Sequence, residues 1–159
     1  MIKNNKKIAF WLMKSEPNCY SIDDLKKDKK TMWDGVRNYQ VRNMIRDDMR
    51  VGDNVLFYHS NSGDKTGVVG LMKIVKSAYP DPTQFDSKSE HPDPTSDKNN
   101  PRWFCVDVKY VSKFKRPISL AEIKTDPKLQ DMAVAKKGSR LSITPVSKSH
   151  FDRLLKIAN

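Results

Sequence analysis

The chain is poor in residues that reinforce a small fold covalently or with a metal ion. It has two cysteines, Cys19 and Cys105, among 159 residues. They lack the spacing of a zinc site and are too few for a disulfide framework, so we expect no metal. This excludes a disulfide-rich secreted scaffold and indicates a reducing compartment. We therefore expect a cytoplasmic protein, or a nuclear one if the source organism has a nucleus.

Long hydrophobic runs are also missing. The apolar run "IAFWLM" at residues 8–13 stops at Lys14. Six residues are too few for the core of a signal peptide and far fewer than the ~20 that span a bilayer. The sequence therefore predicts no membrane partner.

The sequence lacks the common catalytic and cofactor motifs. Its six glycines form neither a GxGxxG nor a Walker loop, so we expect no nucleotide cofactor. No His-x-Glu accompanies a Cys-x-x-Cys, which excludes a zinc deaminase. The histidines His59, His91 and His150 occur in unrelated contexts, and no nucleophile elbow is present. We expect no catalytic residues.

Acidic residues are scarce relative to basic ones. The chain has 19 Asp+Glu against 30 Lys+Arg, a formal net charge of +11. Residues 101–159 hold 13 of the basic residues and only 5 of the acidic ones. Such a balance favours polyanions or anionic surfaces as partners. The alternative is that the charge serves solubility alone.

Hydrophobic periodicity predicts strands interleaved with short helices. We expect strands at 8–14, 54–60, 66–75, 102–111 and 139–146. We expect helices at 20–27 with Ser21 as N-cap, at 36–49, from the capping box "SLAE" at 119–122, and at 147–158 with an N-cap at Ser147 or Ser149. These elements lack a regular βαβ alternation. They indicate one α+β domain over 1–159, with its core at about 8–158 and the form of a small mixed barrel with helices outside.

Residues 80–101 show no periodicity and carry several proline-containing turn signals. A loop of this length in a compact domain is typically functional or disordered. We expect it to be only partly ordered, as a flap beside a binding pocket.

Eight phrases taken together closely resemble the EVE domain family over nearly the whole chain. In order they are "FWLMKSEPNCYSIDDL", "WDGVRNYQVRN", "VGDNVLFYHSN", "GVVGLMKIV", "AYPDPTQFD", "PRWFCVDV", "RPISLAEIK" and "SRLSITPV". That family is similar to the PUA and YTH nucleic-acid-binding domains. The resemblance implies a PUA-like mixed β pseudobarrel flanked by short helices. It also implies a pocket for a modified base, such as altered cytosine in DNA or a related base in RNA.

A fainter similarity to YTH readers supports the same pocket. Lys14-Ser15, Trp33 and "FYHSNSGDKTGVV" match their order of motifs. Two stretches depart from the EVE pattern: Val41 replaces an alanine, and "EHPDP" replaces Tyr-Tyr-Asp-Pro. The second change, to His91 and Pro92, removes aromatic rings that would stack on a base.

The resemblance directs attention to "WDGVRNYQVRN" at 33–43. Trp33 would stack on an extruded base, with packing in the core as its alternative role. Gly35 would let the backbone approach the base edge, which amide groups near Val36 would read together with Asn38. Arg37 and Arg42 would hold the flanking phosphates.

Further ligand-binding candidates lie on the predicted strands. Lys14 and Ser15 would close the pocket floor. Two pairs each share a strand face, Tyr58 with Ser60 and Arg140 with Ser142. Barrel packing is the alternative role of these strand residues.

These features predict a non-catalytic reader of a modified nucleobase in DNA or RNA, with a monomer favoured. One alternative is a small amidohydrolase acting on modified nucleobases, with Lys14, Glu16 and Tyr58 as acid and base. Another alternative is a basic adaptor for an acidic protein.

Overall fold

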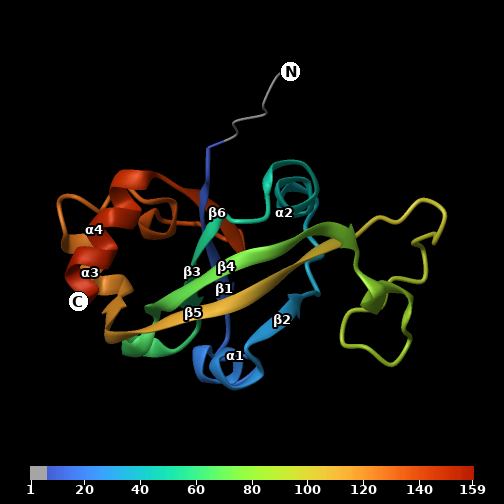
Figure 1. Ribbon diagram of the computed structural model, residues 1–159, viewed down its shortest axis with the longest axis horizontal. Helices are drawn as coiled ribbons and strands as arrows, with labels where there is room; N and C mark the ends of the chain where they lie inside the picture. The colour runs from blue at the N-terminus through green and yellow to red at the C-terminus, as the bar shows by residue number, and fades with distance from the viewer. Residues whose placement is uncertain (1–6) are drawn as a thin grey trace.

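A computed structural model describes residues 7–159, and its centre is a six-stranded mixed sheet (Figure 1). The strands are β1 (Phe10–Ser15), β2 (Lys30–Trp33), β3 (Asn54–His59), β4 (Gly67–Pro80), β5 (Phe104–Ser119) and β6 (Ile143–Val146). Their order across the sheet is β2-β5-β4-β3-β1-β6, with β1 and β3 parallel and the other neighbours antiparallel. The predicted mixed α+β fold is confirmed. The expected barrel closure is wrong, because strand pairing within 7–159 ends at β2 and β6.

Short helices flank the sheet. The α-helices are α1 (Ile22–Asp28), α2 (Tyr39–Asn43), α3 (Leu120–Thr125) and α4 (Lys148–Ala158). Single turns of other helix types occur at η1 (Met44–Asp48, π), η2 (Gly63–Lys65), η3 (Pro82–Phe85) and η4 (Ala133–Ala135). In residues 7–159, no helix is long and apolar enough to cross a membrane.

Serine caps set the starts of three helices, as the sequence predicts. Ser21 and Ser147 accept backbone hydrogen bonds at the starts of α1 and α4. Ser119 likewise accepts from the Glu122 amide at α3. The Glu122 carboxylate, however, binds the Arg116 guanidinium at 2.8 Å, so the expected capping box at "SLAE" is only half formed.

The region after Trp33 differs most from expectation. The helix expected over 36–49 begins only at Tyr39, because Asn38 is its N-cap and accepts from the Val41 amide at 3.0 Å. It then widens into a π-turn at Met44. Strand β2 lies just before this region and was not predicted at all.

Two apolar clusters fill opposite sides of the sheet. The first contains Trp11, Trp33 and Phe57, and the second contains Leu12 and Leu154. Neighbouring side chains of β1 thus point into different clusters, as strand alternation requires. In Figure 1, α3 and α4 gather at one end of the molecule, and the loop between β4 and β5 extends at the other.

The loop between β4 and β5 is held by buried polar contacts. Gln84 is 1% exposed and donates from Nε2 to the carbonyls of Asp81 at 2.7 Å and Trp103 at 2.9 Å. The indole N–H of Trp103 donates to Asp93 at 2.7 Å. These contacts hold the loop at Gln84 and Asp93, and our expectation of partial order stays a prediction. Gln84 also accepts hydrogen bonds from the Ser96 hydroxyl at 2.5 Å and the Asp93 amide at 2.8 Å, which link it to the middle of the loop.

Candidate functional site

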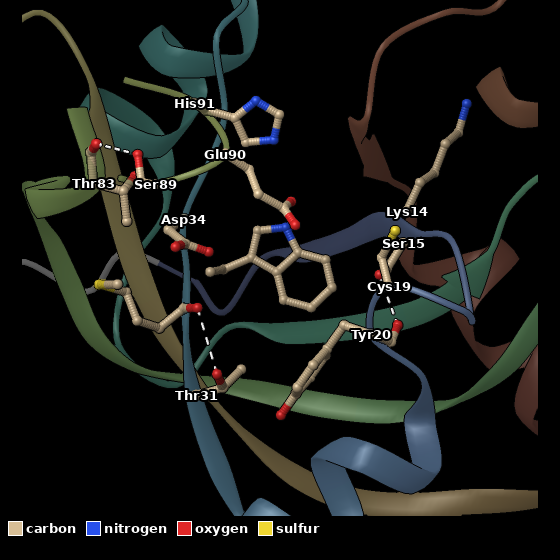
Figure 2. A pocket seen from close by; sticks show the side chains of 13 residues that line it. Lys14, Ser15, Cys19, Tyr20, Thr31, Asp34, Thr83, Ser89, Glu90 and His91 are labelled. Atoms are coloured by element: carbon tan, nitrogen blue, oxygen red, sulfur yellow. Dashed lines mark hydrogen bonds between the residues drawn. The ribbon is translucent and has the colours of Figure 1, made fainter. Parts of the chain in front are cut away.

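A cavity of about 520 Å³ lies between three segments that are far apart in the sequence (Figure 2). Its lining residues are Lys14, Ser15, Cys19 and Tyr20 after β1, residues 31–35 of β2 and the following turn, and Thr83, Ser89, Glu90 and His91 of the β4–β5 loop. Figure 2 shows Lys14, Ser15 and Cys19 across the cavity from Asp34, Thr83 and Ser89. The loop therefore does border the pocket, as the sequence predicts for a flap.

Trp33 is both a core residue and part of the cavity wall. Its side chain is 9% exposed and meets the Phe57 ring nearly at right angles, with centroids 5.5 Å apart. The same residue lines the cavity. The two roles considered for Trp33 are thus compatible, because one part of the indole packs inward while another part borders open space.

Gly35 shapes the turn that follows β2. Its φ of +80° lies in the left-handed region, and a Cβ there would approach His91 Cδ2 to 2.9 Å. Its amide donates to Asp81 at 2.8 Å. The glycine therefore brings the backbone close to the loop. We expected the backbone at Gly35 to approach the edge of a base. The Gly35 amide instead binds the Asp81 carboxylate of the protein itself.

Asp81 joins the turn to the loop from a fully buried position. Burial alone would raise its pKa, but hydrogen bonds from Thr83, Gly35 and Arg37 outweigh burial and lower the pKa. The carboxylate is thus held in its charged form as a structural anchor.

Asp34 is the opposite kind of carboxylate, and sequence reasoning missed it. It lines the cavity beside Trp33. Although the residue is exposed by surface area, partial desolvation at the cavity, followed by repulsion from Asp81, raises its pKa. A carboxyl group placed this way can accept a hydrogen bond from a ligand's amino group, which would also relieve its desolvation.

Lys14 and Ser15 are on the cavity wall, as predicted. Lys14 is half-buried, and this burial lowers its pKa. Its ammonium group lies 5.9 Å from the Tyr58 ring centroid. The Ser15 hydroxyl donates to the Tyr20 carbonyl at 2.7 Å, which fixes the turn after β1.

Four other predicted ligand residues lie outside the cavity lining. Val36 is 7% exposed, and Tyr58 is 2% exposed within the second apolar cluster, where burial raises its pKa to about 12. The side-chain oxygen of Asn38 accepts the hydrogen bond that caps α2. Arg140 is exposed elsewhere. The structure brings none of these four onto the cavity wall, and their ligand roles stay predictions.

Ser60 and Ser142 contact the cavity segment only through the backbone. The Ser60 amide donates to the Ser15 carbonyl at 3.0 Å, and the Lys14 amide donates to the Ser142 carbonyl at 2.8 Å. These two residues therefore position the end of β1. A direct ligand contact from either side chain also stays a prediction.

Arg37 uses its guanidinium within the protein. It donates to the His91 carbonyl at 2.6 and 3.0 Å, to Asp81 at 3.1 Å and to Thr83 at 3.1 Å. These contacts tie the turn after β2 to the loop. The geometry thus disfavours the phosphate contact predicted for Arg37.

Arg42 retains more freedom at the surface. Its Nη1 donates to the Arg102 carbonyl at 2.9 Å, and its Nε donates to Asn43 Oδ1 at 2.9 Å. The guanidinium carbon lies 4.9 Å from the Tyr39 ring centroid, and that ring stacks on Trp103 with centroids 4.9 Å apart. This stack fixes the position of α2 against the base of the loop and leaves Arg42 at its outer end.

No metal centre accompanies the cavity. Residues 7–159 contain no group of three or more His, Cys, Asp or Glu side chains that could hold a metal ion.

Comparisons with known proteins place the chain in context. The sequence model of the EVE domain family matches residues 9–157 of this chain. Thymocyte nuclear protein 1 from Homo sapiens is 46% identical over 168 residues, covering 94% of this chain and 73% of that protein.

Solved structures show the same fold. A protein from Pseudomonas syringae is 42% identical with a TM-score of 0.90, covering 95% of this chain and all of that chain. Human THYN1, solved in complex with 5-methylcytosine-containing DNA, is 44% identical with a TM-score of 0.86, covering 94% of this chain and 97% of that chain. The family model and these similarities all extend over the strands that build the cavity, and the chain belongs to the EVE domain family.

Proposed function

We propose that this protein is a non-catalytic reader that binds modified cytosine in nucleic acid, with a single base held in the cavity. The DNA bound to the human relative contains 5-methylcytosine, and this supports the ligand class. The basic composition of the chain supports a polyanionic partner. The protein would act as a single-domain monomer wherever nucleic acid is present, in the nucleus or the cytoplasm.

The cavity has the size and the wall that one base requires. Its volume of about 520 Å³ lies within the range of small-molecule sites. Extruding a base from a stack costs a few kcal/mol. Stacking on the exposed part of Trp33 would return about 1–3 kcal/mol of that cost.

The observation that carries the proposal is the pairing of Trp33 with Asp34 on one cavity wall. Cytosine carries an exocyclic amino group that donates hydrogen bonds, and a carboxylate is its natural acceptor. Thymine has a carbonyl oxygen at the same place, which an aspartate carboxylate would repel. Asp34 would therefore select an amino-bearing base, whether methylated or not.

The remaining contacts follow from the positions of the basic residues. Lys14 lies across the cavity from Asp34 with its ammonium group pointing away from Asp34 (Figure 2), and a change of its side-chain rotamer would let it donate to the carbonyl oxygen of the base. Arg42 would hold a flanking phosphate through Nη2, since its Nη1 and Nε already donate to Arg102 and Asn43.

The test compares three oligonucleotides that differ only in one base: 5-methylcytosine, cytosine or thymine. Fluorescence anisotropy should show the tightest binding to 5-methylcytosine and the weakest to thymine. Thymine differs from 5-methylcytosine in carrying an oxygen in place of the amino group and a proton on N3, so this pair probes the base edge that Asp34 would contact. Asp34→Asn should shrink the 5-methylcytosine preference over thymine by about 1–2 kcal/mol.

Asp48→Asn is the matched control, because Asp48 is an exposed carboxylate at the end of η1, outside the cavity lining. It changes the net charge equally and should leave the preference intact. Equal binding of all three oligonucleotides by the unmodified protein would refute the proposed function.

The lowered pKa of Lys14 favours one alternative, an amidohydrolase with this amine as general base. Incubation with N4-acylated cytidine distinguishes the two functions. A reader returns the nucleoside unchanged, whereas appearance of free carboxylic acid at a rate that Lys14→Met abolishes would establish the enzyme.

A further inference from the structure

One row of paired residues crosses the entire sheet and changes from apolar at the β6 edge to basic at the β2 edge. From one edge strand to the other it contains Val146, Phe10, Asn54, Lys73, Lys109 and Lys30. Because directly paired residues point to the same side, all six share one face of the sheet. The Phe10 ring packs against Phe151 of α4 with centroids 4.6 Å apart, so the β6 end of this face is covered.

The other half of this face is basic and open. Lys30 and Lys109 are exposed, and Lys73 is partly exposed. Figure 1 shows β4 and β5 with no helix lying in front of them. We call Lys30, Lys73 and Lys109 the lysine row.

The lysine row is unfavourable for folding. Like charges directly opposite in a sheet are destabilising, since their Cβ atoms lie only about 4.5–5.5 Å apart. Other cations of the chain avoid this cost by pairing, such as Lys113 with Asp23 at 2.8 Å. Within the described residues, no ion pair joins any member of the lysine row to a carboxylate.

One acidic residue lies on the same face, and it is already engaged. Asp107 precedes Lys109 by two residues and accepts a hydrogen bond from the Tyr79 hydroxyl. The Lys76 ammonium group lies 4.1 Å from the centroid of that same Tyr79 ring. The local charge therefore stays strongly positive.

We propose that the lysine row binds the phosphate backbone of the nucleic acid whose base enters the cavity. This inference rests on the proposed function. Three adjacent strands span about 10 Å, and three successive phosphates of one strand span about 7 Å along a duplex axis. Flexible lysine side chains readily bridge that difference.

Strand β2 connects the lysine row to the cavity. Met32 shares the face of Lys30, since it follows by two residues and pairs with Asp107. Met32 also lines the cavity. Trp33 lies on the opposite face, so a nucleic acid strand that bends around the β2 edge would place a base in the cavity and its neighbouring phosphates on the lysine row.

The test neutralises the lysine row by combining Lys30→Gln, Lys73→Gln and Lys109→Gln. The matched control combines Lys124→Gln, Lys137→Gln and Lys156→Gln, which remove equal charge from exposed positions in or near α3 and α4. Affinity for a short oligonucleotide is measured from low to physiological salt by anisotropy. Melting temperatures are measured for both variants.

Loss of the lysine row should weaken binding at least about tenfold at low salt. It should reduce the slope of log affinity against log salt by about 2–3, since each phosphate contact contributes nearly one. The ratio of affinities for 5-methylcytosine and thymine should not change, because phosphate contacts position without reading sequence. The melting temperature should stay equal or rise as repulsion is relieved.

Equal losses in both triple variants would overturn the proposal, since only net charge would then matter. So would an unchanged salt slope in the lysine-row variant. If the proposed function is wrong but the lysine row does bind phosphates, the results differ. The unmodified protein would then bind all three bases with equal affinity, and the lysine-row variant would still bind unmodified DNA more weakly than the control variant.

Discussion

At the β6 end of the sheet, α3 and α4 cover the strands with apolar side chains, whereas the β2 end borders a polar cavity and the open lysine row. Leu12 and Leu154 at the first end are fully buried. At the second end, Asp34 is kept in a setting that raises its pKa. One end of the continuous sheet thus contributes packing energy. The other end carries Asp34 and the lysine row, whose charged groups face the cavity or the surface.

The comparison also explains why two carboxylates near the cavity, Asp81 and Asp34, have pKa values shifted in opposite directions. Asp81 receives hydrogen bonds from Thr83, Gly35 and Arg37 and serves the structure. Asp34 faces the cavity. Polar groups that are hydrogen-bonded within the protein hold the site together. Polar groups that face the cavity are available to bind a ligand.

The largest effect should come from truncating one large side chain at each end. Leu154→Ala should lower the free energy of unfolding by about 2–5 kcal/mol and leave base preference unchanged. Trp33→Ala should cost stability as well, because the indole packs on Phe57. It should also weaken binding to the 5-methylcytosine oligonucleotide by about 1–3 kcal/mol.

Urea unfolding and anisotropy on the same samples, below the melting temperature of each variant, separate the two effects. Trp33→Phe is the intermediate variant, since its smaller ring should keep part of the preference. If Trp33→Ala remains folded and prefers 5-methylcytosine as before, the stacking role is wrong and the two ends do not differ in function.

A smaller effect should appear when the pH falls from 7 to 5. His59 Nε2 accepts a hydrogen bond from the Ile22 amide at 3.1 Å, and burial lowers the pKa of His59. The unfolded chain therefore binds the proton more readily, so this contribution to stability is present above pH 6.5 and is lost as the pH falls below it. At the α4 end, the pKa values of Asp126 and Asp131 are lowered, and their contributions are lost only below about 3.8.

The raised pKa of Asp34 has the opposite effect on stability, because its protonation favours the folded state as the pH falls. His59→Gln isolates the histidine contribution from this one. The loss of stability between pH 7 and 5 should be smaller in His59→Gln than in the unmodified protein. Identical pH profiles by urea unfolding would show that the His59 contact does not contribute.

Local signals in the sequence were enough to predict most elements. The strand expected at 54–60 is β3, and the serine caps of α1 and α4 lie where the sequence places them. These features depend on residues within one or two turns of each other. Strand β2 was missed because four residues at a sheet edge carry too little alternation, and its partner β5 lies more than 70 residues further along.

The candidate site was predictable only in part. Lys14, Ser15 and Trp33 line the cavity, as the family resemblance implies. Asp34 follows Trp33 directly, so its position next to the expected stacking residue was a usable signal. Glu90 and His91 reach the cavity only because Arg37 and Asp81 fix the loop, and no local pattern encodes such long-range contacts.

The central claim is that the cavity itself takes the modified base, and a nucleoside without phosphate tests it most directly. Titrating 5-methyl-2′-deoxycytidine into isotope-labelled protein should shift the amide resonances of Ser15, Thr31 and Ser89 in a saturable way. Thymidine should shift them less at equal concentration. Amides around Leu154 should not move. Saturable shifts confined to residues outside the cavity, or none at any residue up to millimolar nucleoside, would contradict the account.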